Sequence, residues 1–238
     1  MSDEFIALIP ARSGSKGIKN KNLLKIGKDS LIGWSIKSAR SIDDVSKVVF
    51  SSDSNYYLNH AKKYKVDEVI LRSAKASTDK ATDNDYFEET IIYLEKKNIK
   101  FKYIVLLRPT TPLRNNAILN KAINFFIKNK DNFNSMRSVN QMSESAFKSF
   151  TVSKNRLYSI MGIKPDESNN SRHAFKNTFE GNGYIDIVKK NYFKKYGSLF
   201  GKKVLAFQTD FAYEIDNIND YDYAKFEFAR NMKKYNSL

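Results

Sequence analysis

The stretch Phe5-Ile-Ala-Leu-Ile-Pro-Ala-Arg-Ser-Gly-Ser-Lys-Gly-Ile-Lys-Asn-Lys-Asn22 joins an apolar run to a loop rich in glycine and positive charge. The apolar run, Phe5–Pro10, predicts a buried strand. Glycine lets a backbone approach an anion closely, and backbone N–H groups in such a loop can converge on its oxygens. The loop also carries three cations that would offset the repulsion among phosphates: Arg12, Lys16 and Lys21. The stretch indicates an α/β protein that binds a polyphosphate.

The spacing of the glycines excludes two familiar phosphate loops. Gly14-Ser-Lys-Gly17 has neither the G-x-x-x-x-G-K-S/T spacing of a P-loop nor the G-x-G-x-x-G spacing of a dinucleotide-binding turn. Glycine is nevertheless concentrated here, because four of the nine glycines lie between residues 14 and 33. Residue types alone explain the loop equally well as a solvated basic connection between a strand and a helix.

Length and composition limit the class of protein. A chain of 238 residues suits one domain of generous size, with room for a small insertion. The sequence shows neither a leader nor an apolar run near the roughly 18 residues of a membrane span, so we expect a cytoplasmic protein with no membrane partner. The chain has no cysteine and only two histidines, His60 and His173. Any metal is therefore expected to be held by oxygen.

The net charge favours anionic partners. The chain has 41 Lys and Arg residues against 26 Asp and Glu residues, a net charge of +15. Most of the excess is lysine scattered through helical patterns, such as Lys62-Lys63 and Lys96-Lys97, and a solvated helix face is the simpler interpretation. Charge alone therefore does not indicate a nucleic-acid-binding protein.

Apolar runs and helical periodicities alternate along the chain. Buried strands are predicted at Phe5–Pro10, Lys47–Ser51, Val66–Leu71, Tyr103–Leu107, Gly183–Val188 and Val204–Gln208. Helices are predicted at Leu31–Ala39, Tyr56–Tyr64, Tyr86–Lys97 and, closing the chain, Asp220–Asn231. This alternation indicates parallel β-α-β units with helices on both faces of the sheet.

Three polar segments follow predicted strands and should line one edge of the sheet. They are the Arg12 loop, Ser51-Ser52-Asp53 and Arg108-Pro-Thr-Thr-Pro-Leu-Arg114. Ligands of open α/β sheets bind outside the carboxyl ends of the strands. The third segment holds two of the four prolines, which stiffen a turn rich in donors from Arg108, Thr110, Thr111 and Arg114. A ligand-binding turn and a capped turn that opens a helix at Asn116 both explain this pattern.

The second half of the chain contributes further polar candidates. Glu214-Ile215-Asp216 places two carboxylates on one face of an extended segment, where they could hold Mg²⁺. In isolation, Asp216 is better explained as a helix cap. Arg172 could pair with a carboxylate or phosphate, and Asn182 lies between two glycines in a segment that a hairpin turn explains equally well. His173 is interpreted as a surface histidine.

Residues from about Ser135 to Phe179 show no long periodic run and mix Ser, Asn, Lys and Met. We interpret this segment as an insertion rather than a part of the core. A mobile lid, a dimerisation element and a long surface excursion are equally compatible with it.

Taken together, these segments resemble the acylneuraminate cytidylyltransferase family, the CMP-sialic acid synthetases and their relatives. The resemblance rests on Ile9–Gly17 with Lys21-Asn22, on Leu107–Arg114, on Asn182-Gly183 and on Glu214–Asp216, in the family's order and approximate spacing. It implies one domain over residues 1–238, with a three-layer, mostly parallel sheet of the nucleotide-diphospho-sugar transferase type. It also implies a homodimer built partly from an insertion at residues 135–180. The implied reaction transfers CMP from CTP to the anomeric hydroxyl of a nine-carbon 2-keto acid sugar and releases pyrophosphate.

The resemblance also implies roles for individual residues. Arg12, Lys16 and Lys21 would bind the triphosphate and, with Asp216, act in catalysis. Ser15 and Asn22 would bind CTP, and Arg72 with Ala81 would line the base and ribose side. The sugar side would comprise Arg108, Thr110, Arg172 and Asn182, and the Mg²⁺ ligands would be Glu214 and Asp216. Arg108 stands where many relatives carry glutamine, and Glu214 replaces a more familiar aspartate.

One departure from the family concerns the acceptor sugar. Sialic acid synthetases usually carry an arginine two residues before the asparagine of the Asn-Gly pair, where this chain has Glu180. With Arg108, this change leads us to expect a relative of sialic acid, such as legionaminic or pseudaminic acid. The alternatives are a CMP-Kdo synthetase-like enzyme, a sugar-nucleotide-binding protein without catalysis, and a basic nucleic-acid-binding protein, which has no need for an acidic pair.

Overall fold

A seven-stranded sheet forms the centre of the computed structural model, which describes residues 5–14, 17–78 and 80–235 and leaves the side chains of residues 233 and 234 undescribed. The strand order is β11-β7-β10-β6-β1-β4-β5. The bounds are β1 Phe5–Pro10, β4 Val45–Ser52, β5 Glu68–Leu71, β6 Tyr103–Leu106, β7 Ser135–Gln141, β10 Phe179–Lys189 and β11 Val204–Gln208. Strand β10 is antiparallel to both of its neighbours, and the other pairs are parallel. The expected mostly parallel sheet is confirmed.

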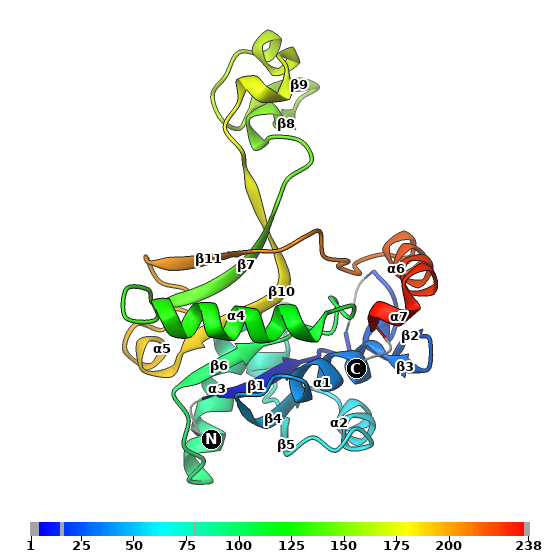
Figure 1. The fold of residues 1–238 in the computed structure, drawn as a ribbon, viewed down its shortest axis with the longest axis vertical. Coiled ribbons are helices and arrows are strands. Elements are labelled where there is room, and N and C mark those ends of the chain that lie inside the picture. The colour runs from blue at the N-terminus through cyan, green and yellow to red at the C-terminus, as the bar shows by residue number, and fades with distance from the viewer. Residues whose placement is uncertain (1–4, 15–16, 79, 236–238) are drawn as a thin grey trace.

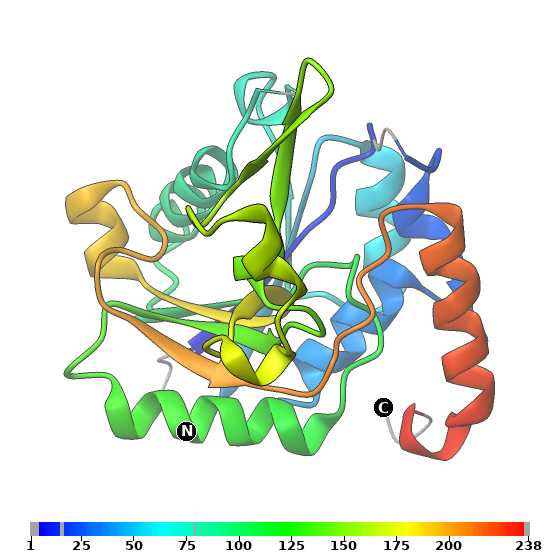
Figure 2. The ribbon, with the colours of Figure 1, turned by 90° about the horizontal axis from the view of Figure 1, so that it is seen from above.

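Helices cover both faces of this sheet (Figures 1 and 2). Their bounds are α1 Leu31–Arg40, α2 Asn55–Lys62, α3 Asp83–Lys96, α4 Asn116–Asn129, α5 Lys190–Tyr196, α6 Ile218–Arg230 and α7 Met232–Tyr235. Phe5, Ala7 and Ile9 of β1 pack in one core cluster with α1, α2 and α4, whereas Ile6 and Leu8 pack in another with α3 and α5. This alternation follows from the two-residue period of a strand and produces the expected three layers.

Short elements complete the fold. A small ribbon of β2 (Lys25–Ile26) and β3 (Asp29–Ser30) follows the first loop, and β8 (Phe150–Ser153) pairs with β9 (Arg156–Ser159). Ser30 caps α1, because its hydroxyl accepts from the Gly33 amide and lies 2.8 Å from His60 Nε2. No helix in the described ranges is long and apolar enough to cross a bilayer.

The expected insertion needs a correction at its first boundary. Residues Ser135–Gln141, which the sequence places in the insertion, form β7 and pair with both β10 and β11 in the main sheet. The strand escapes detection because it is short and mostly polar, with Ser135, Ser138 and Asn140 buried in it. The part that leaves the sheet is residues 142–178, hereafter the arm, which projects from the body and carries β8 and β9 (Figure 1).

Candidate active site

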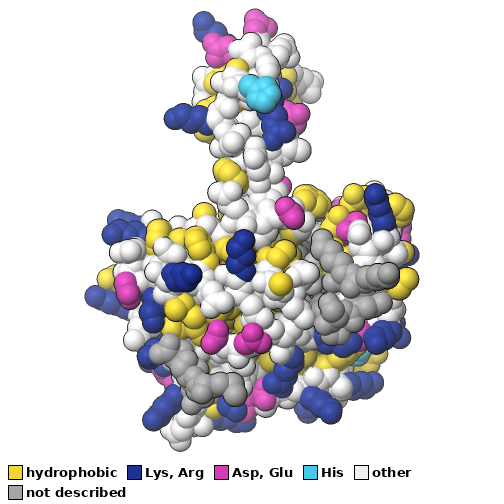
Figure 3. Space-filling model, viewed as in Figure 1, with side chains coloured by type: hydrophobic (Ala, Val, Ile, Leu, Met, Phe, Trp, Pro, Cys, Tyr) yellow, Lys and Arg dark blue, Asp and Glu magenta, His cyan; other side chains and the backbone are white. Residues whose placement is uncertain are grey.

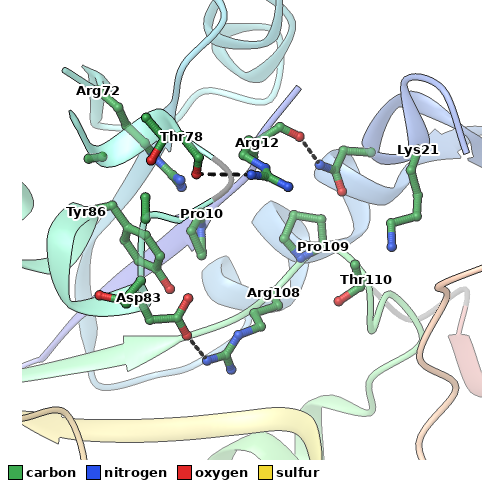
Figure 4. Close-up of a pocket in the computed structure, with 14 residues that line it drawn as sticks. Pro10, Arg12, Lys21, Arg72, Thr78, Asp83, Tyr86, Arg108, Pro109 and Thr110 are labelled. Carbon is green, nitrogen blue, oxygen red and sulfur yellow. Dashed lines mark hydrogen bonds and ion pairs between the residues drawn. The ribbon is translucent and has the colours of Figure 1, made fainter. Parts of the chain in front are cut away.

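A cavity of about 320 Å³ opens at the carboxyl edge of the sheet, where the loops after β1, β5 and β6 meet (Figure 4). Seven residues that the sequence singles out line it: Arg12, Lys21, Asn22, Arg72, Ala81, Arg108 and Thr110. The described lining contains four cations and one carboxylate, Asp83. This balance favours an anionic ligand.

The Arg12 loop is tied to two other loops at this edge. The Ser13 amide donates to Asp53 Oδ1 at 2.8 Å, and the Ser13 hydroxyl donates to Asp53 Oδ2 at 3.1 Å. Arg12 Nη1 donates to the Thr78 carbonyl at 3.2 Å, and Asn22 Nδ2 donates to the Arg12 carbonyl at 3.0 Å. The loop is therefore held in place at the cavity. Ser15 and Lys16, which we expect to bind CTP, lie outside the described residues.

Asn22 presents a hydrogen-bond acceptor at the cavity, and Arg72 presents hydrogen-bond donors. Asn22 is buried, and its Oδ1 accepts no hydrogen bond from the described residues. Arg72 is 8% exposed and donates to the Ser51 hydroxyl at 3.0 Å and the Ser51 carbonyl at 3.1 Å. Its guanidinium carbon lies 4.3 Å from the centre of the Tyr86 ring. Burial lowers the pKa of Arg72 and raises the pKa of Tyr86.

Arg108 is held by carboxylates on two sides. Its Nη1 donates to Asp186 Oδ2 at 2.7 Å, and its Nη2 donates to Asp83 Oδ2 at 2.6 Å. Asp186 belongs to β10 and Asp83 is the first residue of α3, so Arg108 connects the buried side of the sheet to the cavity wall formed by α3. Burial opposes its charge, but Tyr86, Asp186 and Asp83 more than offset this and raise the Arg108 pKa.

Two donors of the Arg108–Arg114 turn, Thr111 and Arg114, do not reach the cavity, contrary to our expectation. Thr111 and Arg114 are fully buried. Arg114 donates to the carbonyls of Tyr184 (2.6 Å), Gly183 (3.1 Å) and Arg108 (2.9 Å) and to the Ser35 hydroxyl (3.1 Å). Arg114 thus fixes the shape of the turn that presents Arg108, and burial lowers the pKa of its guanidinium.

The acidic pair lies beside Lys21. Lys21 Nζ contacts Asp216 Oδ1 at 3.0 Å, and Thr110 Oγ1 donates to Glu214 Oε1 at 3.3 Å. Desolvation and the nearby charge of Asp216 raise the pKa of Glu214. A Cβ on Gly17 would lie 2.3 Å from the Asp216 carbonyl, so only glycine lets the first loop pass this close to the acidic segment. The first loop and the acidic pair therefore belong to one site.

The local interpretation of Asp216 as a helix cap is wrong. Asn217 caps α6, because its side chain accepts from the amides of Asn219 and Asp220. The Asp216 carboxylate, whose side chain is 71% exposed, points instead toward Lys21. Two carboxylates fit Mg²⁺, which is commonly bound by one or two carboxylates together with substrate phosphates and water. The described ranges contain no cluster of three or more acidic, histidine or cysteine ligands.

Two expected sugar-side residues are absent from the cavity lining within this chain. Asn182 is buried, and its amide donates to the Thr209 hydroxyl at 2.7 Å and accepts from the Tyr184 amide at 3.2 Å. Arg172 is exposed on the arm, as is His173. Glu180 lies where the arm joins β10 and accepts from Asn140 Nδ2 at 3.0 Å.

Sequence reasoning missed Asp83, Tyr86 and Asp186 as parts of the site. The first two belong to the start of α3, where a capping box of Thr82 and Asp85 is the recognisable signal. Asp186 follows a glycine-flanked turn and looks like an ordinary strand residue. Only the tertiary fold brings these side chains to Arg108 and Arg72, so the capping box marks the start of α3 but not its part in the site.

A family model described as cytidylyltransferase matches residues 6–235. The chain belongs to the cytidylyltransferase family. The N-acylneuraminate cytidylyltransferase of Escherichia coli is 27% identical over 94% of this chain and 52% of its own length. The pseudaminic acid cytidylyltransferase of Campylobacter jejuni is 26% identical over 95% of this chain and 97% of its own length. This cytidylyltransferase therefore spans about half of the first relative and nearly all of the second.

A solved structure supports the fold. CMP:2-keto-3-deoxy-manno-octonic acid synthetase complexed with CTP superposes with a TM-score of 0.71 and covers 95% of this chain and 99% of its own. The two sequences are only 13% identical. The likeness confirms the α/β architecture that the family membership implies.

Proposed function

We propose that this cytidylyltransferase transfers CMP from CTP to the anomeric hydroxyl of a nine-carbon acidic sugar and releases pyrophosphate. The sugar would be of the sialic, legionaminic or pseudaminic acid type. The observation that carries the proposal is the convergence of Arg12, Lys21 and Arg72 on one cavity, with the acidic pair beside Lys21. Relatives over most of the chain carry names of this activity.

On this proposal, the nucleotide would bind along the wall formed by the first loop and Arg72. Asn22 Oδ1 is a buried acceptor and Arg72 a buried donor, and a cytosine edge presents both an amino donor and carbonyl or ring-nitrogen acceptors. Arg12, Lys21 and the residues of the loop that include Ser15 and Lys16 would bind the phosphates. Positive groups fixed before the reaction stabilise the departing pyrophosphate without reorganising.

We further propose that Glu214 and Asp216 would hold Mg²⁺. When bound, the metal would neutralise phosphate charge and polarise the oxygens around the α-phosphorus. Lys21 lines the cavity and contacts Asp216, so this carboxylate lies next to a cation of the cavity wall. Thr110 orients Glu214 through its hydroxyl.

The test of this function is an assay of pyrophosphate release. Purified protein with CTP and Mg²⁺ is expected to release pyrophosphate only when a suitable acceptor is present, among sialic, legionaminic and pseudaminic acids. Turnover with Kdo alone would assign a CMP-Kdo synthetase instead. Folded protein that is silent with all four sugars would contradict the proposal.

The positive side chains in Figure 3 are dispersed over the body of the drawn face, which does not favour a nucleic-acid-binding surface.

We propose a homodimer formed through the arm. The β8–β9 part of the arm exposes a group of apolar side chains: Val152, Leu157, Tyr158, Ile160 and Met161. Such a group favours an interface. In a dimer, the arm would also bring Arg172 toward the cavity of a second subunit, which would reconcile its expected sugar-side role with its place outside this cavity.

Sedimentation velocity tests the dimer. The wild-type protein is expected to sediment as a dimer, and Leu157→Glu is expected to raise the dissociation constant at least tenfold, because it places a charge in an apolar interface. Ile92→Glu is the matched control, since Ile92 is similarly exposed on α3 of the body. A monomeric wild type, or equal effects of the two changes, would overturn the arm interface.

A further inference from the structure

We propose that Asp83 is a specificity-determining residue that competes with the carboxylate of the acceptor sugar for Arg108. The inference rests on the proposed function and deepens it. Its starting point is the unequal environment of the two carboxylates on this guanidinium. Asp186 is fully buried, whereas the side chain of Asp83 is 42% exposed.

Asp83 and Arg108 both face the cavity. The Arg108 side chain is 21% exposed, and both residues belong to the lining. Figure 4 shows Asp83 reaching Arg108 from the α3 wall, below Tyr86, while Pro109 and Thr110 continue the opposite wall. The ion pair therefore lies where a ligand would contact the guanidinium.

The net charge around Arg108 indicates whether a sugar carboxylate would join the two aspartates on the guanidinium or replace one of them. One guanidinium with two carboxylates carries a net charge of −1. A third carboxylate that joined this group would meet net repulsion, because like charges at short range in a partly buried site are poorly screened. A sugar carboxylate that replaced Asp83 would leave the local charge unchanged. It would also gain a guanidinium whose planar fork of donors matches a carboxylate.

Asp83 is the partner that can be exchanged. Removing the guanidinium from Asp186 would leave a buried carboxylate without its counter-charge, which is strongly unfavourable. Asp83 can instead be hydrated, and it is the first residue of the 14-residue helix α3, whose N-terminal dipole stabilises a negative charge. Asp186 therefore positions Arg108 permanently, while Asp83 holds it until an anionic ligand takes its place.

Steady-state kinetics test this competition. Asp83→Asn is expected to lower the KM for the acceptor sugar about two- to fivefold, the range for losing an exposed ion pair. The KM for CTP should stay the same. Glu88→Gln is the matched control, because it removes the same charge from the next turn of α3 without contacting Arg108. Glu88→Gln should leave the KM for the sugar and the KM for CTP unchanged. This control separates the effect of a lost negative charge on α3 from the effect of losing the Asp83 carboxylate beside Arg108.

A substrate analogue separates competition from a structural role. With the acceptor's carboxamide analogue as an inhibitor, Asp83→Asn should show no gain in affinity, because the analogue lacks the anion that competes. If Asp83 only held α3 in place, Asp83→Asn and Asp83→Ala would raise the KM for CTP and lower the melting temperature. An acceptor KM that is unchanged or raised would overturn the inference. Silence of the wild type with every sugar would instead contradict the proposed function.

Discussion

Replacing Asp216 with asparagine is expected to lower kcat about 100-fold or more, the scale on which loss of one preorganised electrostatic group acts. Asparagine keeps the shape of the side chain but removes the charge that would hold Mg²⁺ and that pairs with Lys21. The fold should survive, because the Asp216 side chain is 71% exposed and the oxygen of asparagine can still accept a hydrogen bond from Lys21. Pyrophosphate release under saturating CTP and acceptor is the measurement.

Asp222→Asn is the control for Asp216→Asn. Asp222 is an exposed aspartate of α6 whose ion-pair partner among the described residues is a neighbour on its own helix, Lys225, at 3.0 Å. Its replacement should leave kcat within about twofold of the wild type, as expected for a surface position. Comparable turnover by Asp216→Asn and Asp222→Asn, with both proteins folded, would reject the metal and charge role of Asp216.

Replacing Arg114 with methionine is expected to lower the free energy of unfolding by about 3–5 kcal/mol, because several buried acceptors lose their donor at once. Three carbonyls and the Ser35 hydroxyl now accept from this one guanidinium. Trp34, the single tryptophan, is 3% exposed and can report unfolding in guanidinium chloride by fluorescence.

Arg114→Lys distinguishes the hydrogen bonds from the charge. Lysine keeps the charge but has no planar fork that reaches four acceptors, so it should recover only a minor part of the loss. Recovery of most of the stability by lysine would show that charge, rather than hydrogen bonding, decides. A loss below about 1 kcal/mol in Arg114→Met would contradict the structural role, because that is the typical effect of an ordinary substitution.

The sequence predicts the strands whose buried residues form apolar runs. Strands β1 and β11 have the predicted bounds, and β4, β5, β6 and β10 lie within a few residues of theirs. Strand β7 could not be found from the hydrophobic pattern, because several of its buried residues are polar. The buried Ser138 hydroxyl, for example, accepts a hydrogen bond from the Ile185 amide at 2.9 Å. Polar residues inside a sheet defeat a prediction that depends on hydrophobic pattern.

The sequence predicts which segments form the candidate site, but not which side chains contact one another there. The first loop, the Arg108 turn and the acidic pair are recognisable because each is a compact motif. The turn itself shows the limit, since its two arginines look alike in sequence but Arg108 faces the cavity and Arg114 is fully buried. Which arginine faces the cavity depends on Tyr184 and Gly183, about 70 residues later in the chain, because their carbonyls accept from Arg114.

The strand order has a consequence for synthesis on the ribosome. The first four strands to be made in the sheet, β1, β4, β5 and β6, are neighbours in it, so the early part of the chain can assemble four of the seven strands. Strand β6 then presents an unpaired edge until β10 is complete, about 80 residues later. At about 5–20 residues per second, this edge would be open for roughly 4 to 16 s. Open edges invite pairing with other chains, so the nascent protein should depend on chaperones most strongly during this interval.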